Sequence, residues 1–176
     1  MIKTGFQLNR RCVALIGGAA LLASSMLPLA HAADGDITEY KLNNGLRVVV
    51  KEDHRSPTVA HMVWYKAGSI DEYNGTTGVA HVLEHMMFKE TKNLKVGEFS
   101  ETVAALGGRD NAFTSRDYTA YFQQLQAKDL SKVMALEADR MANLILSESE
   151  FEKEIKVVME ERRYRTDDKA TGKLYE

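Results

Sequence analysis

The sequence predicts an α+β fold in which a mixed or antiparallel sheet packs against helices. Two hairpin patterns and one further strand pattern lie before residue 127, and amphipathic helical patterns lie between and after them. These strands and helices do not alternate in the regular rhythm of βαβ units, so the pattern favours α+β over a parallel α/β architecture. The chain contains no internal repeat and no low-complexity tract.

The first 32 residues have the three parts of a secretory signal peptide. Three basic residues precede the first acidic one, an apolar run covers residues 12–29, and Ala30-His31-Ala32 is a small-residue cleavage site. The alternative is an uncleaved membrane anchor, because the run approaches the roughly 18 apolar residues that span a bilayer. The glycine pair, the serine pair and Pro28 inside the run disfavour an anchor. We therefore expect an exported protein, periplasmic or secreted, with no stable membrane anchor after cleavage.

Charge and cysteine content limit the chemistry of residues 33–176. Cleavage removes three of the 23 Lys and Arg residues and none of the 25 Asp and Glu residues, which leaves a net charge of −5. This mildly acidic surface has no basic block, so we expect no nucleic-acid partner. Cys12 is the only cysteine, so residues 33–176 offer neither a disulfide nor a thiolate ligand. Any metal must be held by histidine and carboxylate.

The strands are predicted by turn signals and by β-branched and aromatic residues. Asn43-Asn44-Gly45 separates two strand-like runs and is a strong hairpin signal. A polar loop over residues 68–77 leads from the third strand towards the first helix. The predicted strands cover residues 37–42, 46–51, 58–67, 111–114 and 118–125, with Ser115-Arg116-Asp117 as the turn of the second hairpin.

Four amphipathic segments are predicted to be helices, at residues 78–88, 95–106, 127–146 and 147–165. Gly107-Gly108 ends the second, and Ser147 with Glu150 has the capping-box spacing at the start of the fourth. The first is expected to bury Val79, Val82, Leu83, Met86 and Met87, and the third to carry the apolar set Leu130, Val133, Met134, Leu136, Met141 and Ile145. We expect residues 33–176 to form one domain, truncated at its C-terminus, because a further helical segment begins at Lys173.

The first helix carries a metal-binding pattern, His81-Val82-Leu83-Glu84-His85. Residues four apart lie on one helical face, so both imidazoles can reach one ion, and Glu84 projects to the same side. Zinc accepts imidazole nitrogen and can keep one position open for water. We expect Glu84 to act as the base that takes the proton of this water, because a ligand beside His85 would compete for the same coordination geometry.

A third protein ligand is needed, and four residues are candidates. His54 lies in a loop and His61 in a strand, and each is expected to be an ordinary histidine. Glu154 and Glu161 are seven residues apart on one face of the last helix. One of these carboxylates can bind zinc while the other supports a ligand histidine; an acidic, solvated helix face is the alternative for this segment alone.

Together these residues resemble the inverzincin peptidases, the family of pitrilysin, insulin-degrading enzyme and the mitochondrial processing peptidase β-subunit. The resemblance covers nearly all of residues 33–176 and implies a single Zn²⁺ bound by His81, His85 and Glu161, with Glu154 as the supporting acid. Glu160 is the alternative ligand. The resemblance makes residues 33–176 the N-terminal zinc-peptidase domain of such an enzyme.

The segment Gly107-Gly108-Arg109-Asp110-Asn111-Ala112-Phe113-Thr114 is similar to the family pattern G-G-x-x-N-A-x-T. In the family this segment is an edge strand beside the zinc, to which the peptide substrate adds as an extra strand. The resemblance therefore implies that Asn111 hydrogen-bonds the substrate and that Ala112 and Phe113 line its path.

The implied activity is zinc-dependent endopeptidase hydrolysis of peptides or small unfolded proteins. A non-catalytic zinc-binding subunit that presents peptides to an active homologue is the first alternative, and a structural zinc site is the second. Family members enclose the substrate between two related halves, so the resemblance also implies a second homologous half, in the same chain or in a partner subunit.

Overall fold

The computed structural model describes residues 37–174, which form two compact units that divide after Glu52. The described part of the first unit is a hairpin of β1 (Ile37–Lys41) and β2 (Arg47–Lys51). The two strands are antiparallel, with Ile37 opposite Lys51 and Lys41 opposite Arg47. Gly45 adopts a positive φ of 89° in the turn, a conformation that glycine tolerates without a steric penalty. The hairpin predicted from Asn43-Asn44-Gly45 is confirmed.

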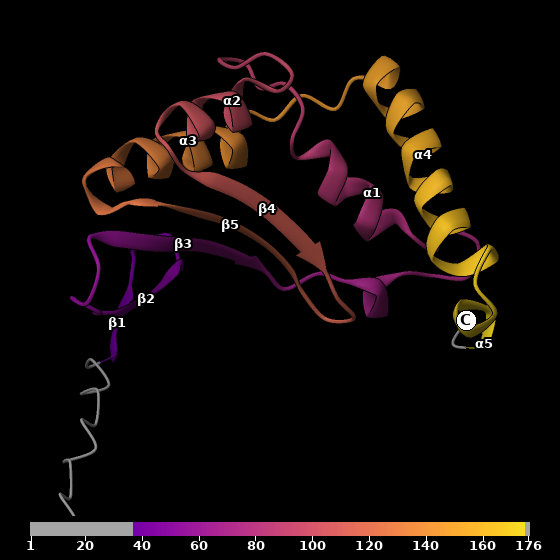
Figure 1. Cartoon of the computed structure of the whole chain (residues 1–176), viewed down its shortest axis with the longest axis horizontal. Helices are drawn as coiled ribbons and strands as arrows, with labels where there is room; N and C mark the ends of the chain where they lie inside the picture. The colour runs from indigo at the N-terminus through magenta and orange to yellow at the C-terminus, as the bar shows by residue number, and fades with distance from the viewer. Residues whose placement is uncertain (1–36, 175–176) are drawn as a thin grey trace, which may run out of the picture. The chain divides into compact units, whose positions relative to one another are not determined.

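The second unit contains a three-stranded antiparallel sheet (Figure 1). Its strands are β3 (Thr58–Tyr65), β4 (Arg109–Thr114) and β5 (Thr119–Gln126), in the order β3-β5-β4. β5 is the central strand, and β4 is an edge strand of the sheet that the described residues form. The α+β class and the antiparallel sheet predicted from the sequence are therefore confirmed.

Two helices cover one face of this sheet and form the core with it. α2 (Glu98–Ala105) and α3 (Leu130–Asn143) lie on the same side of β5 and β4 (Figure 1). Strand alternation directs every second residue of the sheet towards these helices. The buried apolar cluster consists of Phe99, Val103, Leu125 and Val133.

Two other helices run side by side near the end of β4. α1 (Val79–Met86) lies between β4 and α4 (Glu148–Arg162) (Figure 1). A π-helical turn, η3 (Arg163–Asp167), continues α4, and α5 (Ala170–Leu174) follows it. π-Helical turns are frequently found at functional sites.

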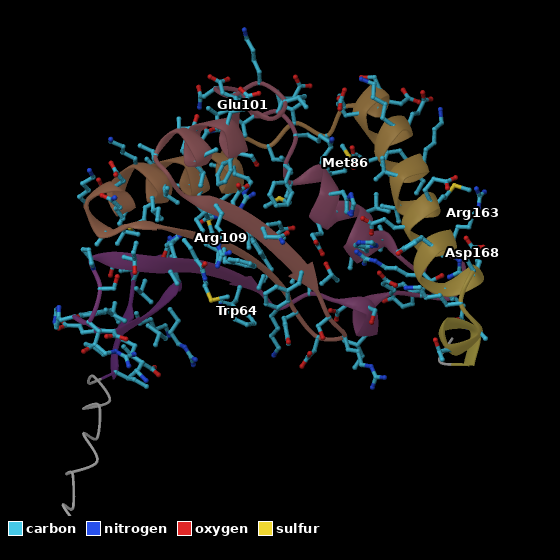
Figure 2. All side chains as sticks on the ribbon, in the orientation of Figure 1. Trp64, Met86, Glu101, Arg109, Arg163 and Asp168 are labelled. Carbon is cyan, nitrogen blue, oxygen red and sulfur yellow. The ribbon has the colours of Figure 1, made fainter. Side chains whose placement is uncertain are left out.

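The opposite face of the sheet carries exposed aromatic side chains. Trp64 on β3 is 55% exposed and projects away from the helices (Figure 2). Its ring centroid lies 5.8 Å from that of Phe113 and 5.0 Å from that of Tyr118.

The structure corrects the predicted buried faces of two helices. Val79 and Leu83 of α1 are exposed, whereas Val82, Met86 and Met87 are buried as expected. In α3 the apolar residues Met134 and Met141 are exposed, while Glu137 and Arg140 are buried. Ile145, also expected in this helix, lies beyond its end at Asn143 and is exposed. These two charged residues are buried because they pair with each other in the core, with 2.6 Å between Arg140 Nη2 and Glu137 Oε2.

The capping box expected at the start of α4 does not form. Ser147 is the N-cap residue, but its side chain makes no capping hydrogen bond. Glu150 is instead engaged by two lysines, with Lys153 Nζ at 2.5 Å and Lys89 Nζ at 3.9 Å.

Within residues 37–174 no helix is both long enough and apolar enough to cross a bilayer. The signal peptide predicted at residues 1–32 lies outside the described residues.

Candidate metal centre

The start of α1 is held by a carboxylate from the preceding loop. Gly78, the N-cap residue, has a positive φ of 93° and no side chain with which to cap the helix. Glu72 supplies the cap, because its Oε2 accepts the Gly78 N–H and its Oε1 accepts the Ala80 N–H, each at 2.8 Å. A carboxylate at this end also interacts favourably with the helix dipole. Glu72 thus fixes the first turn of the helix that carries His81 and His85.

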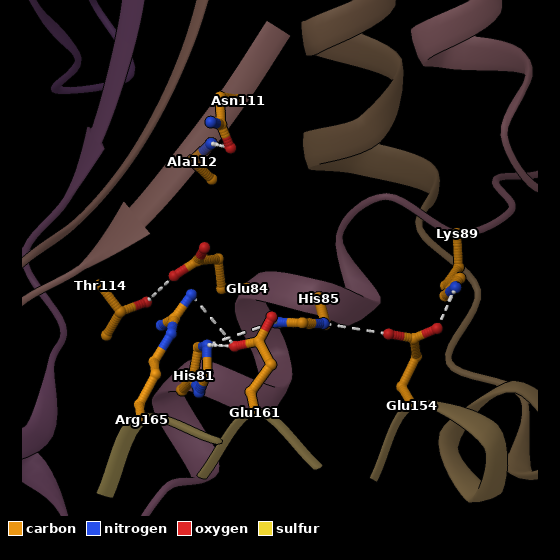
Figure 3. A network of polar contacts seen from close by, with 10 residues as sticks. All are labelled: His81, Glu84, His85, Lys89, Asn111, Ala112, Thr114, Glu154, Glu161 and Arg165. Carbon is orange, nitrogen blue, oxygen red and sulfur yellow. Dashed lines mark hydrogen bonds and ion pairs between the residues drawn. The ribbon is translucent and has the colours of Figure 1, made fainter. Parts of the chain in front are cut away.

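The imidazoles of His81 and His85 lie one turn apart on α1 and face the same point. Their Nε2 atoms are 3.2 Å apart, and their rings meet edge to face with centroids separated by 4.8 Å. Glu161 projects from the last turn of α4 towards the same point (Figure 3). Its Oε2 lies 3.5 Å from His81 Nε2, and its Oε1 lies 4.0 Å from His85 Nε2.

These separations fit a tetrahedral zinc ion. With metal–ligand bonds of about 2.0–2.1 Å, tetrahedral ligand atoms lie about 3.3–3.4 Å from one another. The Nε2–Nε2 and Nε2–Oε2 distances of 3.2 and 3.5 Å are close to this value. One ligand atom from each of His81, His85 and Glu161 lies within 4.8 Å of the others. Three protein ligands of this kind leave a fourth position for water.

The surroundings of Glu161 also fit a cation. Its Oε2 is buried and has no hydrogen-bond partner among the described residues. The guanidinium of Arg165 approaches this oxygen, with Nη2 at 3.4 Å, from the π-helical turn η3. A buried carboxylate oxygen without a hydrogen bond is costly unless a positive charge is close. The donor set, and a carboxylate oxygen without a hydrogen bond, therefore suit a bound divalent metal.

A chain of polar contacts extends from His85 away from the cluster. Glu154 Oε2 lies 3.0 Å from His85 Nδ1, and Lys89 Nζ lies 2.5 Å from Glu154 Oε1 (Figure 3). Burial of the Glu154 carboxyl favours its neutral form, but the hydrogen bonds and charges of Lys89 and His85 outweigh burial and hold its pKa below the usual value. An ionised Glu154 accepts a hydrogen bond from Nδ1–H, which leaves the His85 Nε2 lone pair directed at the cluster.

Glu84 lies beside the cluster but makes a different contact. Its Oε2 accepts a hydrogen bond of 2.5 Å from the hydroxyl of Thr114, at the end of β4 (Figure 3). The carboxylate is half-buried. A carboxylate next to a metal site is placed to accept a proton from water.

β4 lies along one side of the same cleft. The cleft has a volume of about 940 Å³ and is lined by His81, Glu84, His85 and Glu161 together with Asn111, Ala112 and Phe113. Ser115 N–H bonds back to Tyr118 at 2.8 Å, so by strand alternation the Ala112 N–H points to the open edge. There it donates to Asn111 Oδ1 at 2.8 Å. This edge presents backbone groups that an extended peptide can pair with.

The structure brings most of the predicted site residues together. His81, His85, Glu161, Glu84, Glu154 and the segment Asn111–Phe113 all line the cleft. His61 lies elsewhere, with its Nδ1 2.8 Å from Gln123 Oε1. Glu160 turns away from the cluster and pairs with Arg163 at 2.9 Å. His54 is likewise absent from the cluster of possible ligands found in residues 37–174.

Four contacts at the cleft were not predicted from the sequence. They come from Glu72, Lys89, Thr114 and Arg165. Lys89 follows His85 by one helical turn, and this spacing was the one available signal for its contact with α4. Arg165 likewise follows Glu161 by one helical turn, and Glu72 lies only six and eight residues before the groups that it caps. The contact between Thr114 and Glu84 joins residues 30 positions apart, and no local pattern indicates it.

Comparisons with known proteins agree with this geometry. The family described as "Insulinase (Peptidase family M16)" matches residues 47–175. The chain is 44% identical over 159 residues to the zinc protease PqqE of Helicobacter pylori, and this match covers 90% of the chain and 34% of PqqE. It is 34% identical over 153 residues to bovine cytochrome b-c1 complex subunit 1, covering 87% of the chain and 32% of that protein.

Solved structures show the same fold. The crystal structure of a protease from Helicobacter pylori has a TM-score of 0.78 at 44% identity, covering 81% of the chain and 34% of that protein. The first half of the periplasmic protease PqqL from Escherichia coli has a TM-score of 0.71 at 30% identity, covering 79% of the chain and 31% of the solved chain.

The chain spans about a third of the length of the curated relatives that it matches. Within that third, the family match, the identity to PqqE and the shared fold all point to one group. The chain belongs to the insulinase family of peptidases, peptidase family M16.

Proposed function

We propose that the chain provides the zinc-binding and proton-transferring side chains of a zinc-dependent endopeptidase. The observation that carries the proposal is the convergence of His81 Nε2, His85 Nε2 and a buried Glu161 oxygen at tetrahedral spacing, with the Glu84 carboxylate beside them. The name of the relative PqqE as a zinc protease supports zinc over other divalent metals, as does the N₂O donor set.

The residues of the proposed site have different roles. His81, His85 and Glu161 would hold zinc, which when bound supplies the Lewis acidity that polarises a peptide carbonyl and acidifies water. Glu84 accepts a proton from the attacking water and returns it to the leaving amine. Glu154 orients His85 through Nδ1, and Lys89 keeps Glu154 in place.

The edge strand β4 is the proposed substrate-binding element. A peptide that pairs with this edge runs beside Glu84, because Thr114 of the same strand contacts that carboxylate. Asn111 would exchange its bond to the Ala112 N–H for one to the substrate, and Ala112 and Phe113 would line the peptide's path. Recognition through backbone groups favours extended or unfolded peptides.

One comparison favours an alternative function. Bovine cytochrome b-c1 complex subunit 1 is a relative whose name describes no protease, so the alternative is a non-catalytic subunit that presents peptides to an active homologue. The presence of His81, Glu84, His85 and Glu161 together in one cleft favours the active enzyme.

The proposal also includes export of the protein and a second homologous half that encloses the substrate. PqqL is described as periplasmic, and its solved structure is described as a first half; together with the predicted signal peptide at residues 1–32, this supports an exported enzyme completed by a second homologous half. Purification of the mature protein under native conditions tests whether that half belongs to the same chain or to a partner, because a partner would co-purify as a second polypeptide.

The test is hydrolysis of a fluorogenic peptide library by the zinc-loaded mature protein, before and after chelation. Activity should be lost with chelator and restored by zinc. Glu84→Gln should retain zinc but lower kcat by roughly 10²- to 10⁴-fold, because an amide cannot accept the proton. Glu101→Gln, which changes an exposed carboxylate on α2, is the matched control.

Two outcomes would contradict the proposal. A folded, zinc-loaded protein with no activity towards any peptide would favour the non-catalytic subunit. A Glu84→Gln variant with wild-type kcat would show that another group is the base.

A further inference from the structure

Thr114 makes a contact that the proposed function leaves unexplained. It is the last residue of the edge strand β4, and its side chain lies on the strand face that meets α1. There its hydroxyl lies 2.5 Å from Glu84 Oε2. No other side-chain hydrogen bond to Glu84 is found within residues 37–174. The orientation of this carboxylate therefore depends on one hydroxyl group.

The proton of that hydroxyl can be assigned by counting donors. Thr119 lies opposite Thr114 in the register of β4 and β5, and the two hydroxyl oxygens are 3.3 Å apart. The single proton of the Thr119 hydroxyl goes to the Ala67 carbonyl, which can only accept, at 3.0 Å. An ionised Glu84 can also only accept. Thr114 must therefore be the donor in its contact with Glu84.

The fold holds Thr114 firmly in place. Ser115 N–H bonds to Tyr118 O at 2.8 Å and closes the hairpin directly after Thr114. The loop before α1 braces this hairpin from outside, because Ile70 N–H bonds to Arg116 O at 2.7 Å. Threonine is also β-branched, so few side-chain rotamers are open to it. A glutamate side chain has three rotatable bonds, so an external contact is needed to fix its carboxylate.

We propose that Thr114 is a positioning residue for Glu84: its hydroxyl, presented by the edge strand, holds Oε2 and leaves Oε1 to accept the proton of water. The inference rests on the proposed function of Glu84 as the base. It adds that β4 has two roles, because the strand that pairs with the peptide also orients the base. Removal of the hydroxyl should therefore slow the chemical step without weakening zinc or substrate binding.

The decisive comparison is between Thr114→Val, which has nearly the same shape but no hydroxyl, and Thr114→Ser, which restores the hydroxyl. In the zinc-loaded mature protein, Thr114→Val should lower kcat by roughly 10- to 100-fold, the scale on which misplacement of a catalytic group acts. The KM and the zinc dissociation constant should stay at wild-type values. Thr114→Ser should recover most of the lost kcat.

Two further variants separate positioning from loss of fold. In the Glu84→Gln background, Thr114→Val should cause no additional loss of kcat, because there is no base left to position. Thr102→Val is the matched control, since its hydroxyl bonds to Glu98 O within α2, at 2.7 Å, and its kinetics should be unchanged. Crystal structures of the metal-free variants give a readout without activity: Glu84 should occupy one rotamer in the Thr114→Ser variant and several in the Thr114→Val variant.

The outcomes are distinguishable from failure of the proposed function. Inactive wild-type protein would overturn both. If the wild type is active and Glu84→Gln is not, wild-type kcat in Thr114→Val would overturn only the role of Thr114. The role of Thr114 would also be overturned if the double variant showed a loss of kcat equal to the product of the two single losses. A single Glu84 rotamer in the crystal structure of the Thr114→Val variant would overturn it as well. If Thr114→Val does not fold, Thr114→Ala is subject to the same criteria.

Discussion

Two adjacent glutamates on α4 have opposite surroundings. The side chain of Glu160 is 66% exposed and pairs with Arg163, whereas that of Glu161 is 30% exposed and directs a buried oxygen towards His81. Consecutive helical residues point about 100° apart, so the rotation of α4 about its axis decides which of them reaches the cluster. The burial of Glu161 favours it over Glu160 as the third ligand.

Separate replacement of Glu161 and Glu160 by glutamine tests the assignment of the third zinc ligand at the scale of one residue. Glu161→Gln should weaken zinc binding by more than the roughly 100-fold typical of losing an outer partner, because a direct ligand and its charge are removed. Glu160→Gln makes the same chemical change one position away and should leave the zinc affinity unchanged. Competition with a chromophoric chelator measures both dissociation constants. Equal losses in the two variants, or a larger loss in Glu160→Gln, would reject Glu161 as the ligand.

At the same scale, the sequence predicted which side chains lie in the cleft better than it predicted their neighbours. His81, Glu84 and His85 share a helical face by spacing alone, and resemblance singled out Glu161 over Glu154. The contacts of Lys89 and Thr114 bring together residues 65 and 30 positions apart in the chain. Local periodicity carries no information about such distant pairs, so these two contacts needed the structure.

At the scale of the secondary-structure elements, hairpins were predicted more fully than helix faces. Turn residues such as Asn44-Gly45 act locally, so both hairpins formed where expected. The helix α3 carries apolar residues on more than one side, and its periodicity therefore could not identify the buried face. The actual buried face contains Val133, Glu137 and Arg140. A charged pair inside the core runs against the hydrophobic pattern on which the prediction relied.

α1 begins without a capping side chain of its own, and Glu72 replaces it. We expect Glu72→Ala to lower the free energy of unfolding by about 1 kcal/mol, the usual value of a helix cap. Glu72→Gln should lose less, because its one amide oxygen can still accept from Gly78 or Ala80. Urea unfolding of the metal-free mature protein measures the difference. If the alanine variant were as stable as the wild type, the capping hydrogen bonds would contribute nothing to the stability of α1.

At the scale of the whole second unit, a buried cation connects the core with the segment that follows α1. Arg140 is 1% exposed and Glu137 2%. The guanidinium carbon lies 4.4 Å from the ring centroid of Phe99, 4.5 Å from that of Tyr121 and 5.3 Å from that of Phe88. Phe88 lies two residues after the end of α1, and Tyr121 is in the central strand β5. Arg140 thus contacts the sheet, α2 and the segment that follows α1.

The tyrosines around this ion pair are held in their neutral form. Burial raises the pKa of Tyr65 and of Tyr121, and the negative charge of Glu137 raises both further, while Arg140 acts in the opposite direction. The charge of Glu84 also raises the pKa of Tyr121, so the core and the candidate base interact electrostatically. Glu137 is consequently the one negative charge among the side chains that contact Arg140 in the described core.

Removal of one partner of this pair should be far more harmful than removal of both. Arg140→Met leaves the Glu137 carboxylate buried without its cation and should lower the free energy of unfolding by about 3–5 kcal/mol. Glu137→Leu combined with Arg140→Met replaces the pair by apolar side chains of similar volume, so much of that loss should be recovered. Urea unfolding of the wild type, the two single variants and the double variant completes the cycle. If the double variant were as unstable as the sum of the single ones, the stability would come from the separate contacts of each residue, and the aromatic rings around Arg140 would be its main partners.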